Sequence, residues 1–405
     1  SNFVAWRQAE NKHGGRKFKH SACYFENLVN YLVAMALNPL ANPKGVKLLC
    51  ELCQKPAFEQ CTRCRVTYYC SPEHQKADWL GIHEKICQLL IPLRTPMPML
   101  GSEEDRQHRK NQQLIRQKQM IELCRTTGQK LLFEGKYESA VPAALAALKF
   151  AIQVYGLSSI ELVPSYLILG EASIGLNKLS QANEYLSQAQ WTVLKTPECG
   201  NEIKSRLYRN LGLLEAARKN YFEALNHLSN DVYHSSSAYG TDDVQTSGGY
   251  FHMANVFYRQ NRLDVAFSLY NQVIDIWNGY LTCLVEQRTR EPEVAPGLIG
   301  QMIIGETTND VDVLGEAQEA EAIQVLNAIL ELREQQAVQN ASVMCKLYYT
   351  VAMLHFILND PKQAGEFAVK AKAACENIVS GDVEMEERIL DLSKAIEQIP
   401  TSINK

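Results

Sequence analysis

The chain has 405 residues, which is too long for one small core and predicts two or three folded units. It has the composition of an ordinary soluble protein, with 46% hydrophobic residues, 21% charged residues and a net charge of -4. This slightly acidic balance lacks the basic footprint that binding to nucleic acid or to an anionic membrane surface needs. No apolar run approaches the ~18 residues of a membrane span.

The first 34 residues look unlike the rest of the chain. The chain opens with Ser1, and the stretch NKHGGRKFKH shows no hydrophobic periodicity. We expect Met35 to be the initiator and residues 1–34 to be a gene-model extension or a disordered tail. Residues 35–49 then form a short lead into the next segment.

Residues 50–87 carry four pairs of metal-ligand residues. They read Cys50-x2-Cys53, Cys61-x2-Cys64, Cys70-x3-His74 and His83-x3-Cys87. Tetrahedral zinc takes four thiolate or imidazole ligands, so eight ligands predict two zinc ions. A segment this short buries too little apolar surface to fold alone, and the metal would supply its folding energy.

The alternative for this stretch is a disulfide cluster or a chance group of buried thiols. Six of the twelve cysteines lie here at metal-ligand spacing, together with two histidines. The other six are scattered singly along the chain, at Cys23, Cys124, Cys199, Cys283, Cys345 and Cys375. Single scattered cysteines are typical of reduced intracellular thiols, so we favour the metal.

Residues 50–87, which end in YYCSPEHQKADWLGIHEKIC, resemble the MYND zinc finger in ligand spacing and in the Gln-x3-Trp motif. The resemblance implies interleaved sites. One zinc would be held by Cys50, Cys53, Cys70 and His74. The other would be held by Cys61, Cys64, His83 and Cys87. Many family members have Cys where this chain has His74, and histidine ligates zinc equally well.

The resemblance also implies a peptide site on the finger. The family's described partners are short proline-rich peptides that add as a strand beside the metal core. By matched motif positions, Thr62, Gln75 and Trp79 would line that groove. Trp79 has a second interpretation, because the run QKADWLGI predicts a short helix in which Ala77, Leu80 and the Trp79 ring cover a small core. DNA binding is disfavoured, since the finger lacks a basic recognition helix.

A proline-rich stretch follows over residues 88–101. It contains Pro92, Pro96 and Pro98. Proline cannot continue a helix and restricts the residue before it, so we predict an extended linker. Such a stretch is also a ligand type for aromatic grooves, but a packed linker is the interpretation we favour.

From residue 102 the chain repeats itself with a period of 42 residues. Small residues recur at Gly128, Gly170, Gly212 and Ala254, and twelve residues later at Ala140, Ala182, Ala224 and Ala266. Three residues before these alanines come Tyr137, Leu179, Tyr221 and Leu263. Ala322 and Ala364 continue the period, and the 56 residues from Ala266 to Ala322 predict an insertion of 14 residues across 289–312.

This pattern resembles the tetratricopeptide repeat in the long-helix form found in kinesin light chains. The implied fold is all-α: a solenoid of about six units over residues 102–400, with 383–399 as a terminal cap helix. Its concave groove would be lined by the first helix of each repeat. The groove positions would include Arg125, Gln129, Leu167, Glu171, Arg206, Arg209, Asn210, Phe251 and Asn255. They match a chaperone-tail clamp poorly and fit a protein segment better.

No set of residues predicts catalysis. The histidines of the helical region lie singly, without a matched carboxylate or nucleophile, and the Gly248-Gly249 pair lacks the Lys-Ser/Thr of a phosphate-binding loop. We therefore predict a binding protein that is not an enzyme.

The order of the modules, with stretches such as HEKICQLLIPLRT and TSGGYFHMANVFY, resembles MYND-finger proteins with tetratricopeptide repeats in motile cilia and sperm flagella. The resemblance implies a scaffold in the cytoplasm and the axoneme. It would associate with inner-arm dynein and with another tetratricopeptide-repeat protein. A cytoplasmic dynein-arm assembly factor is the alternative. A nuclear co-repressor adaptor is disfavoured, since RKFK at 16–19 is the one basic run.

Overall fold

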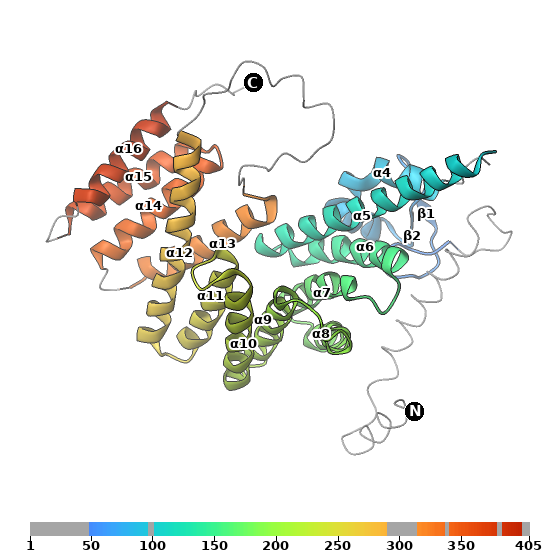
Figure 1. The fold of residues 1–405 in the computed structure, drawn as a ribbon, viewed down its shortest axis with the longest axis horizontal. Helices are drawn as coiled ribbons and strands as arrows, with labels where there is room; N and C mark the ends of the chain where they lie inside the picture. The colour runs from blue at the N-terminus through green and yellow to red at the C-terminus, as the bar shows by residue number, and fades with distance from the viewer. Residues whose placement is uncertain (1–47, 96–100, 290–313, 337–339, 379–382, 399–405) are drawn as a thin grey trace. The chain divides into compact units, whose positions relative to one another are not determined.

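The computed structural model describes residues 48–95, 101–289, 314–336, 340–378 and 383–398 (Figure 1). The predicted extension 1–34, nearly all of the lead 35–49 and nearly all of the predicted insertion lie outside these residues. The described chain is mainly helical and forms two compact units. Unit 1 comprises Ser1–Gly128 and Tyr137–Pro197, and unit 2 comprises Gln129–Lys136 and Glu198–Lys405. None of the described helices has the length and apolar run needed to cross a membrane.

Unit 1 begins with a small two-stranded hairpin and a short helical segment. The strands β1 (Glu59–Gln60) and β2 (Tyr68–Tyr69) pair in antiparallel fashion. Then follow α3 (Pro72–Asp78), the π-helical turn η1 (Trp79–His83) and α4 (Glu84–Arg94). The first helix starts here because Ser71 accepts a hydrogen bond from the backbone N–H of His74 and Pro72 occupies the first turn.

The predicted extended linker over 88–101 is wrong for its first half. Helix α4 continues to Arg94 and carries Pro92 inside it. Leu90 is buried and Ile91 packs against the core around the cysteines, so tertiary packing outweighs the one backbone hydrogen bond that proline removes. Residues 96–100, with Pro96 and Pro98, lie outside the described residues.

The helices that follow form antiparallel pairs. Unit 1 contains most of α5 (Glu103–Phe133), then α6 (Tyr137–Tyr155), the short η2 (Ile160–Leu162), α7 (Val163–Gly175) and α8 (Leu179–Lys195). Unit 2 contains α9 (Asn201–Ala217), α10 (Tyr221–Tyr239), α11 (Val244–Arg259), α12 (Leu263–Thr289) and α13 (Glu316–Glu334). It ends with α14 (Ala341–Ile357), α15 (Pro361–Glu376) and α16 (Val383–Glu397).

The repeat register predicts where the helices start and touch. The second helix of four successive pairs begins at Tyr137, Leu179, Tyr221 and Leu263, three residues before the fully buried alanines. The small residues permit close approach, as predicted. A Cβ added to Gly170 would lie 2.7 Å from Leu186, and one added to Gly212 would lie 2.7 Å from Leu228. Both leucines sit on the second helix of the same pair.

The turn inside each pair has its own 42-residue signature. Gly135, Asn177, Lys219 and Asn261 all have a positive φ, between 57° and 72°. Glycine and asparagine tolerate this left-handed conformation best, and it closes the first helix before the second begins. The same conformation recurs at Asn359, between α14 and α15. The turn therefore repeats as regularly as the helices.

Unit 2 departs from the simple stack at α13. Helix α14 packs directly against α12, where Asn278 Nδ2 donates to Thr350 Oγ1 at 2.9 Å inside the core. The residues at which the repeat predicts a helix before α13 lie outside the described residues. The fifth predicted unit is thus represented by a single described helix, and the last pair, α14 and α15, continues the stack from α12 (Figure 1).

Candidate metal centre

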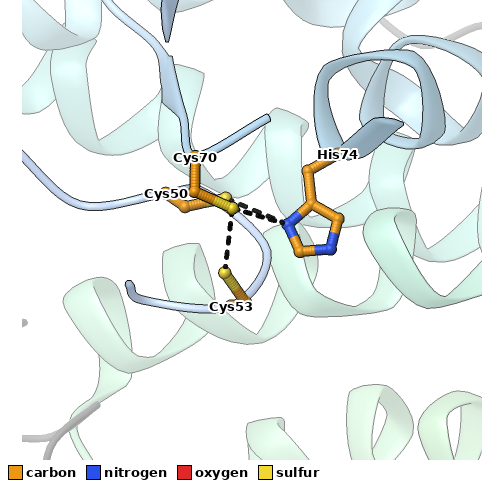
Figure 2. A group of neighbouring side chains, drawn as sticks. All are labelled: Cys50, Cys53, Cys70 and His74. Carbon is orange, nitrogen blue, oxygen red and sulfur yellow. Dashed lines mark hydrogen bonds between the residues drawn. The ribbon is translucent and has the colours of Figure 1, made fainter. Parts of the chain in front are cut away.

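The first group of predicted ligands converges at one point of unit 1 (Figure 2). The donor atoms of Cys50, Cys53, Cys70 and His74 all lie within 4.8 Å of one another. His74 Nδ1 is 3.4 Å from Cys50 Sγ and 3.2 Å from Cys70 Sγ, and Cys53 Sγ is 3.4 Å from Cys70 Sγ. Zinc at about 2.3 Å from each sulfur sets tetrahedral edges of ~3.8 Å, so this donor set fits a zinc ion.

The second group lies deeper. The donor atoms of Cys61, Cys64, His83 and Cys87 also fall within 4.8 Å of one another, and all four residues are buried. Cys61 Sγ lies 4.0 Å from Cys87 Sγ, and Cys64 Sγ lies 3.6 Å from His83 Nε2. The structure thus brings together the first ligand pair with the third and the second with the fourth, which is the interleaved arrangement.

A disulfide cluster does not fit this geometry. All six cysteines of residues 50–87 are free thiols. The 3.4 Å between the sulfurs of Cys53 and Cys70 is far longer than the ~2.05 Å of a disulfide bond. The donor chemistry of each group, three thiols and one imidazole, is that of a closed structural zinc site.

Backbone hydrogen bonds lower the pKa of one cysteine in each group. Burial alone would raise the pKa of Cys61, but hydrogen bonds from the backbone of Cys64 and Arg63 and from the His83 ring lower it to about 6. The pKa of Cys50 is lowered in the same way, to about 7, by the backbone of Cys53 and Cys70 among others. These are the N–H···S bonds of the two-residue knuckle. The knuckle spacing therefore favours the thiolate that a cation needs.

The imidazole of the second group is oriented by residues that the sequence did not single out. Because His83 Nε2 faces Cys64, its Nδ1 points the other way and lies 3.6 Å from Asp78 Oδ2. The Tyr69 hydroxyl donates to the same carboxylate oxygen at 2.6 Å, and both side chains are buried. A carboxylate behind a ligand histidine fixes its ring and raises its basicity. The one indication of this role in the sequence is that an acidic residue, Asp78, lies inside a run that otherwise predicts core residues.

Charge and close packing join the finger to α6. Glu51, between the ligands Cys50 and Cys53, forms ion pairs with Arg94 at the end of α4 and with Lys149 of α6. Burial would raise the pKa of Glu51, but the two cations hold it well below its usual range. Gly81 of η1 lies so close to α6 that an added Cβ would meet the Ser139 carbonyl oxygen at 2.6 Å. The finger is therefore part of unit 1.

The predicted peptide-groove residues lie on the rim of the finger. Thr62 is exposed, and Gln75 and Trp79 are partly buried. The Trp79 ring lies 5.7 Å from the His83 ring and packs against the cysteine core, while the Arg63 guanidinium lies 4.6 Å above it. Trp79 thus has a structural contact and a partly open face.

The prediction that Leu80 covers the finger's core is wrong. Its side chain is 60% exposed. The π-helical turn η1 places Gly81, Ile82 and His83 inward instead, because it adds a residue to the turn and rotates Leu80 outward.

Residues 50–87 match the family model of the MYND finger. Residues 204–278, from α9 into α12, match the tetratricopeptide-repeat family. The chain therefore carries a MYND finger and tetratricopeptide repeats, and both are protein-interaction modules. The two Cys/His groups of the MYND finger are compatible with two zinc ions, which would supply folding energy to the finger.

Several of the groove positions predicted in unit 2 are buried or make contacts within the unit itself. Arg209 pairs with the fully buried Asp231 at 2.8 Å and donates to the Gln245 carbonyl oxygen. A Cβ at Gly248 would lie 2.6 Å from the Arg209 guanidinium, which explains one glycine of the Gly248-Gly249 pair. The prediction of an open lining is wrong for two further residues, Asn210 and Phe251, because both are buried.

In unit 1 the first helices are packed as well. Arg125 is 8% exposed and donates to the Glu161 carbonyl oxygen, while Leu167 is 5% exposed. The prediction that both line the groove is wrong, because both are buried. Their side chains instead fill the space between neighbouring helices.

Three histidines of the helical region lie in packing contacts. His234 stacks on Tyr208 with ring centroids 5.5 Å apart, and His355 stacks on Phe367 at 5.7 Å. His227 also faces Tyr208. These contacts favour structural roles for the three rings.

Proposed function

We propose that the protein is a non-enzymatic scaffold of motile cilia and sperm flagella, associated with inner dynein arms and needed for flagellar motility. It would work in the cytoplasm and the axoneme. The observation that carries the scaffold role is the join between the MYND finger and the first predicted repeat: Glu51, among the zinc ligands, is ion-paired to Lys149 of α6. An interaction module fixed to a predicted repeat in this way suits a fixed assembly point.

The ciliary part of the proposal rests on resemblance. The module order and the stretches HEKICQLLIPLRT, QAQWTVLK, TSGGYFHMANVFY and EAQEAEAI are similar to those of zinc finger MYND domain-containing protein 12. That resemblance implies inner-arm dynein and another tetratricopeptide-repeat protein as partners. It also implies that proline-rich peptides are candidate ligands of the MYND finger beside Thr62, Gln75 and Trp79.

The same proposal includes that the protein has no catalytic activity. Cys124, a thiol outside the metal groups, is buried, and burial raises its pKa to about 12. A nucleophilic thiol needs a lowered pKa and access to a substrate. The arrangement of this thiol therefore supports a packing role.

The test is a fractionation of demembranated sperm or ciliated-cell axonemes with a graded salt wash and an antibody against unit 2. Retention on the axoneme, followed by release together with inner-arm dynein at high salt, is the expected result. Complete recovery in the detergent-soluble cytoplasm would overturn the scaffold proposal and favour a dynein-arm assembly factor. Recovery in the nuclear fraction would favour a co-repressor adaptor.

A further inference from the structure

Helix α13 is an addition to the repeat stack of unit 2. The pair α14–α15 stacks on α12 without it: Asn278 contacts Thr350, and Lys346 Nζ lies 2.6 Å from Asp275 Oδ1. Arg288 near the end of α12 also donates to the Phe356 carbonyl oxygen of α14. Since these contacts hold the last pair on α12, the stack does not depend on α13 for its continuity.

The apolar side of α13 is buried in unit 2. Five side chains form a stripe at helical spacing and are buried: Ala322, Val325, Leu326, Ile329 and Leu330. They belong to the same core cluster as Val244 and Phe251 of α11 and Tyr270 of α12. Ile323, at the edge of this stripe, is exposed. The helix therefore docks by one face, as an amphipathic ligand does in a groove.

Polar contacts anchor the C-terminal end of α13. Arg333 donates to Asn271 Oδ1 at 2.6 Å, and its guanidinium lies 4.3 Å above the ring of Phe267, which also belongs to α12. The Tyr348 hydroxyl of α14 donates to Glu334 Oε1 at 3.0 Å. These contacts set the position of the helix along α12 and α14.

An acidic residue in the middle of α13 interacts with two of the predicted groove positions of α9. Glu321 is partly buried and interacts electrostatically with Arg209 and Arg206. Burial raises the pKa of its carboxyl group, and the two arginines act against that rise. Nearer the N-terminus of α13, Glu316 lies 3.2 Å from Lys130. The acidic edge of α13 thus faces basic residues, while its apolar stripe belongs to the core that α11, α12 and α14 share.

We propose that the face formed by Arg206 and Arg209 of α9 and by Phe251 of α11 is a helix-binding surface, that α13 is its internal occupant, and that a partner binds by placing its own amphipathic helix there. The partner helix would share the pattern of α13, a carboxylate followed by aliphatic residues four, five, eight and nine positions later. This inference deepens the proposed function and rests on its protein-binding role. If α13 is irreplaceable, the partner of that function uses another face.

A tethered helix competes strongly with a free one. Its effective concentration is on the order of millimolar, so a free helix of equal affinity at micromolar concentration does not displace it. A partner must add contacts outside the α13 footprint, or α13 must be weakened. Weakening α13 alone should therefore open the surface to a free peptide.

The probe is a fluorescein-labelled synthetic peptide of residues 316–334, added to the full-length zinc-loaded chain. Leu326→Asp places a charge in the buried stripe, whereas Ile323→Asp places the same charge at its exposed edge. We expect Leu326→Asp to bind the peptide, measured by anisotropy, on the order of tenfold more tightly than the wild type or Ile323→Asp. Equal binding by all three chains would overturn the proposal.

A second measurement covers the case in which Leu326→Asp fails to fold. Protease sites placed in 290–313 and 337–339 would cut the wild-type chain on both sides of α13. We expect α13 to stay bound after cutting and to exchange with the labelled peptide. Unfolding of the cut chain, or a complex that never exchanges, would overturn the proposal. Dimerisation of Leu326→Asp would assign the surface to a second copy of this chain, which also overturns a partner helix. None of these results alters the outcome expected from the axoneme fractionation, so a failure of this inference is distinguishable from a failure of the proposed function.

Discussion

Glu51 Oε2 lies 2.9 Å from Lys149 Nζ, and this ion pair connects a residue between two zinc ligands to the second helix of the first repeat. The side chains of Glu51 and Lys149 are only 18% and 12% exposed, so solvent screens the pair less than it screens a surface pair. Arg94 completes a cluster of one acid and two bases.

This pair should contribute to the stability of unit 1. In a double-mutant cycle of Glu51→Gln and Lys149→Met, we expect a coupling of about 1–3 kcal/mol in the free energy of unfolding, measured with urea. The exposed pair Glu103–Arg106 is the control, with an expected coupling of about 0.5 kcal/mol or less. A similar coupling for both pairs would contradict a structural role for Glu51.

Removing one ligand should remove one metal. Cys53→Ser should lower the zinc content of the purified chain from two ions to one, because its sulfur belongs only to the group with His74. Cys283→Ser is the control, since that exposed thiol lies outside both groups and should leave two ions bound. The measurement is zinc released on thiol modification. A Cys53→Ser chain that retains two ions would contradict the ligand assignment.

Asp78 should tune the second zinc site without binding metal. Asp78→Asn removes the charge that faces His83 Nδ1, so we expect a loss of about 10–100-fold in the affinity of one of the two zinc ions. Competition with a chromophoric chelator measures this affinity. Glu84→Gln, an exposed change directly after His83, should leave both affinities unchanged. Weakening of both sites by Asp78→Asn would instead indicate general unfolding of the finger.

Close packing at Gly81 should tolerate no side chain. Gly81→Ala places a Cβ 2.6 Å from the Ser139 carbonyl oxygen and 2.9 Å from Pro142, and neither the backbone nor the proline ring yields easily. We expect unit 1 to lose about 1–3 kcal/mol of unfolding free energy in urea. Gly279→Ala is the matched change, because its Cβ meets nothing within 4 Å inside α12 and should stabilise unit 2 by up to about 1 kcal/mol. Equal effects of the two changes would refute the close contact.

His252 should make unit 2 sensitive to acid. Burial, with a contribution from the charge of Arg209, lowers the pKa of His252 to about 3, against about 6.5 in an unfolded chain. The unfolded chain therefore binds a proton that the folded unit rejects, and stability falls as the pH drops from about 6.5 toward 3.

His252→Gln should flatten the fall in urea midpoint between pH 7 and about pH 4.5. His108→Gln, an exposed change on α5, should keep the wild-type fall. An unchanged fall in His252→Gln would assign the acid sensitivity to other groups.

The local features of this chain could be predicted from the sequence, and the long-range ones could not. Ligand spacing and the 42-residue register are local, so the metal-ligand groups and helix starts such as Tyr137 follow from residue order and family resemblance. Helix α4 runs through Pro92 because of packing by Leu90 that no local rule contains. Likewise, nothing near Arg209 in the sequence identifies Asp231 or Glu321 as its neighbours, since one lies 22 residues away and the other lies across a long insertion.

The close join between finger and repeat has a mechanical consequence. A finger on a flexible linker would rotate freely, but contacts of Glu51 and Gly81 fix this finger to α6 at two separate points. A pulling force applied to a peptide held by the finger would pass through the Glu51–Lys149 pair into the helices of unit 1. The zinc ions would then stiffen the segment through which that force reaches the repeats.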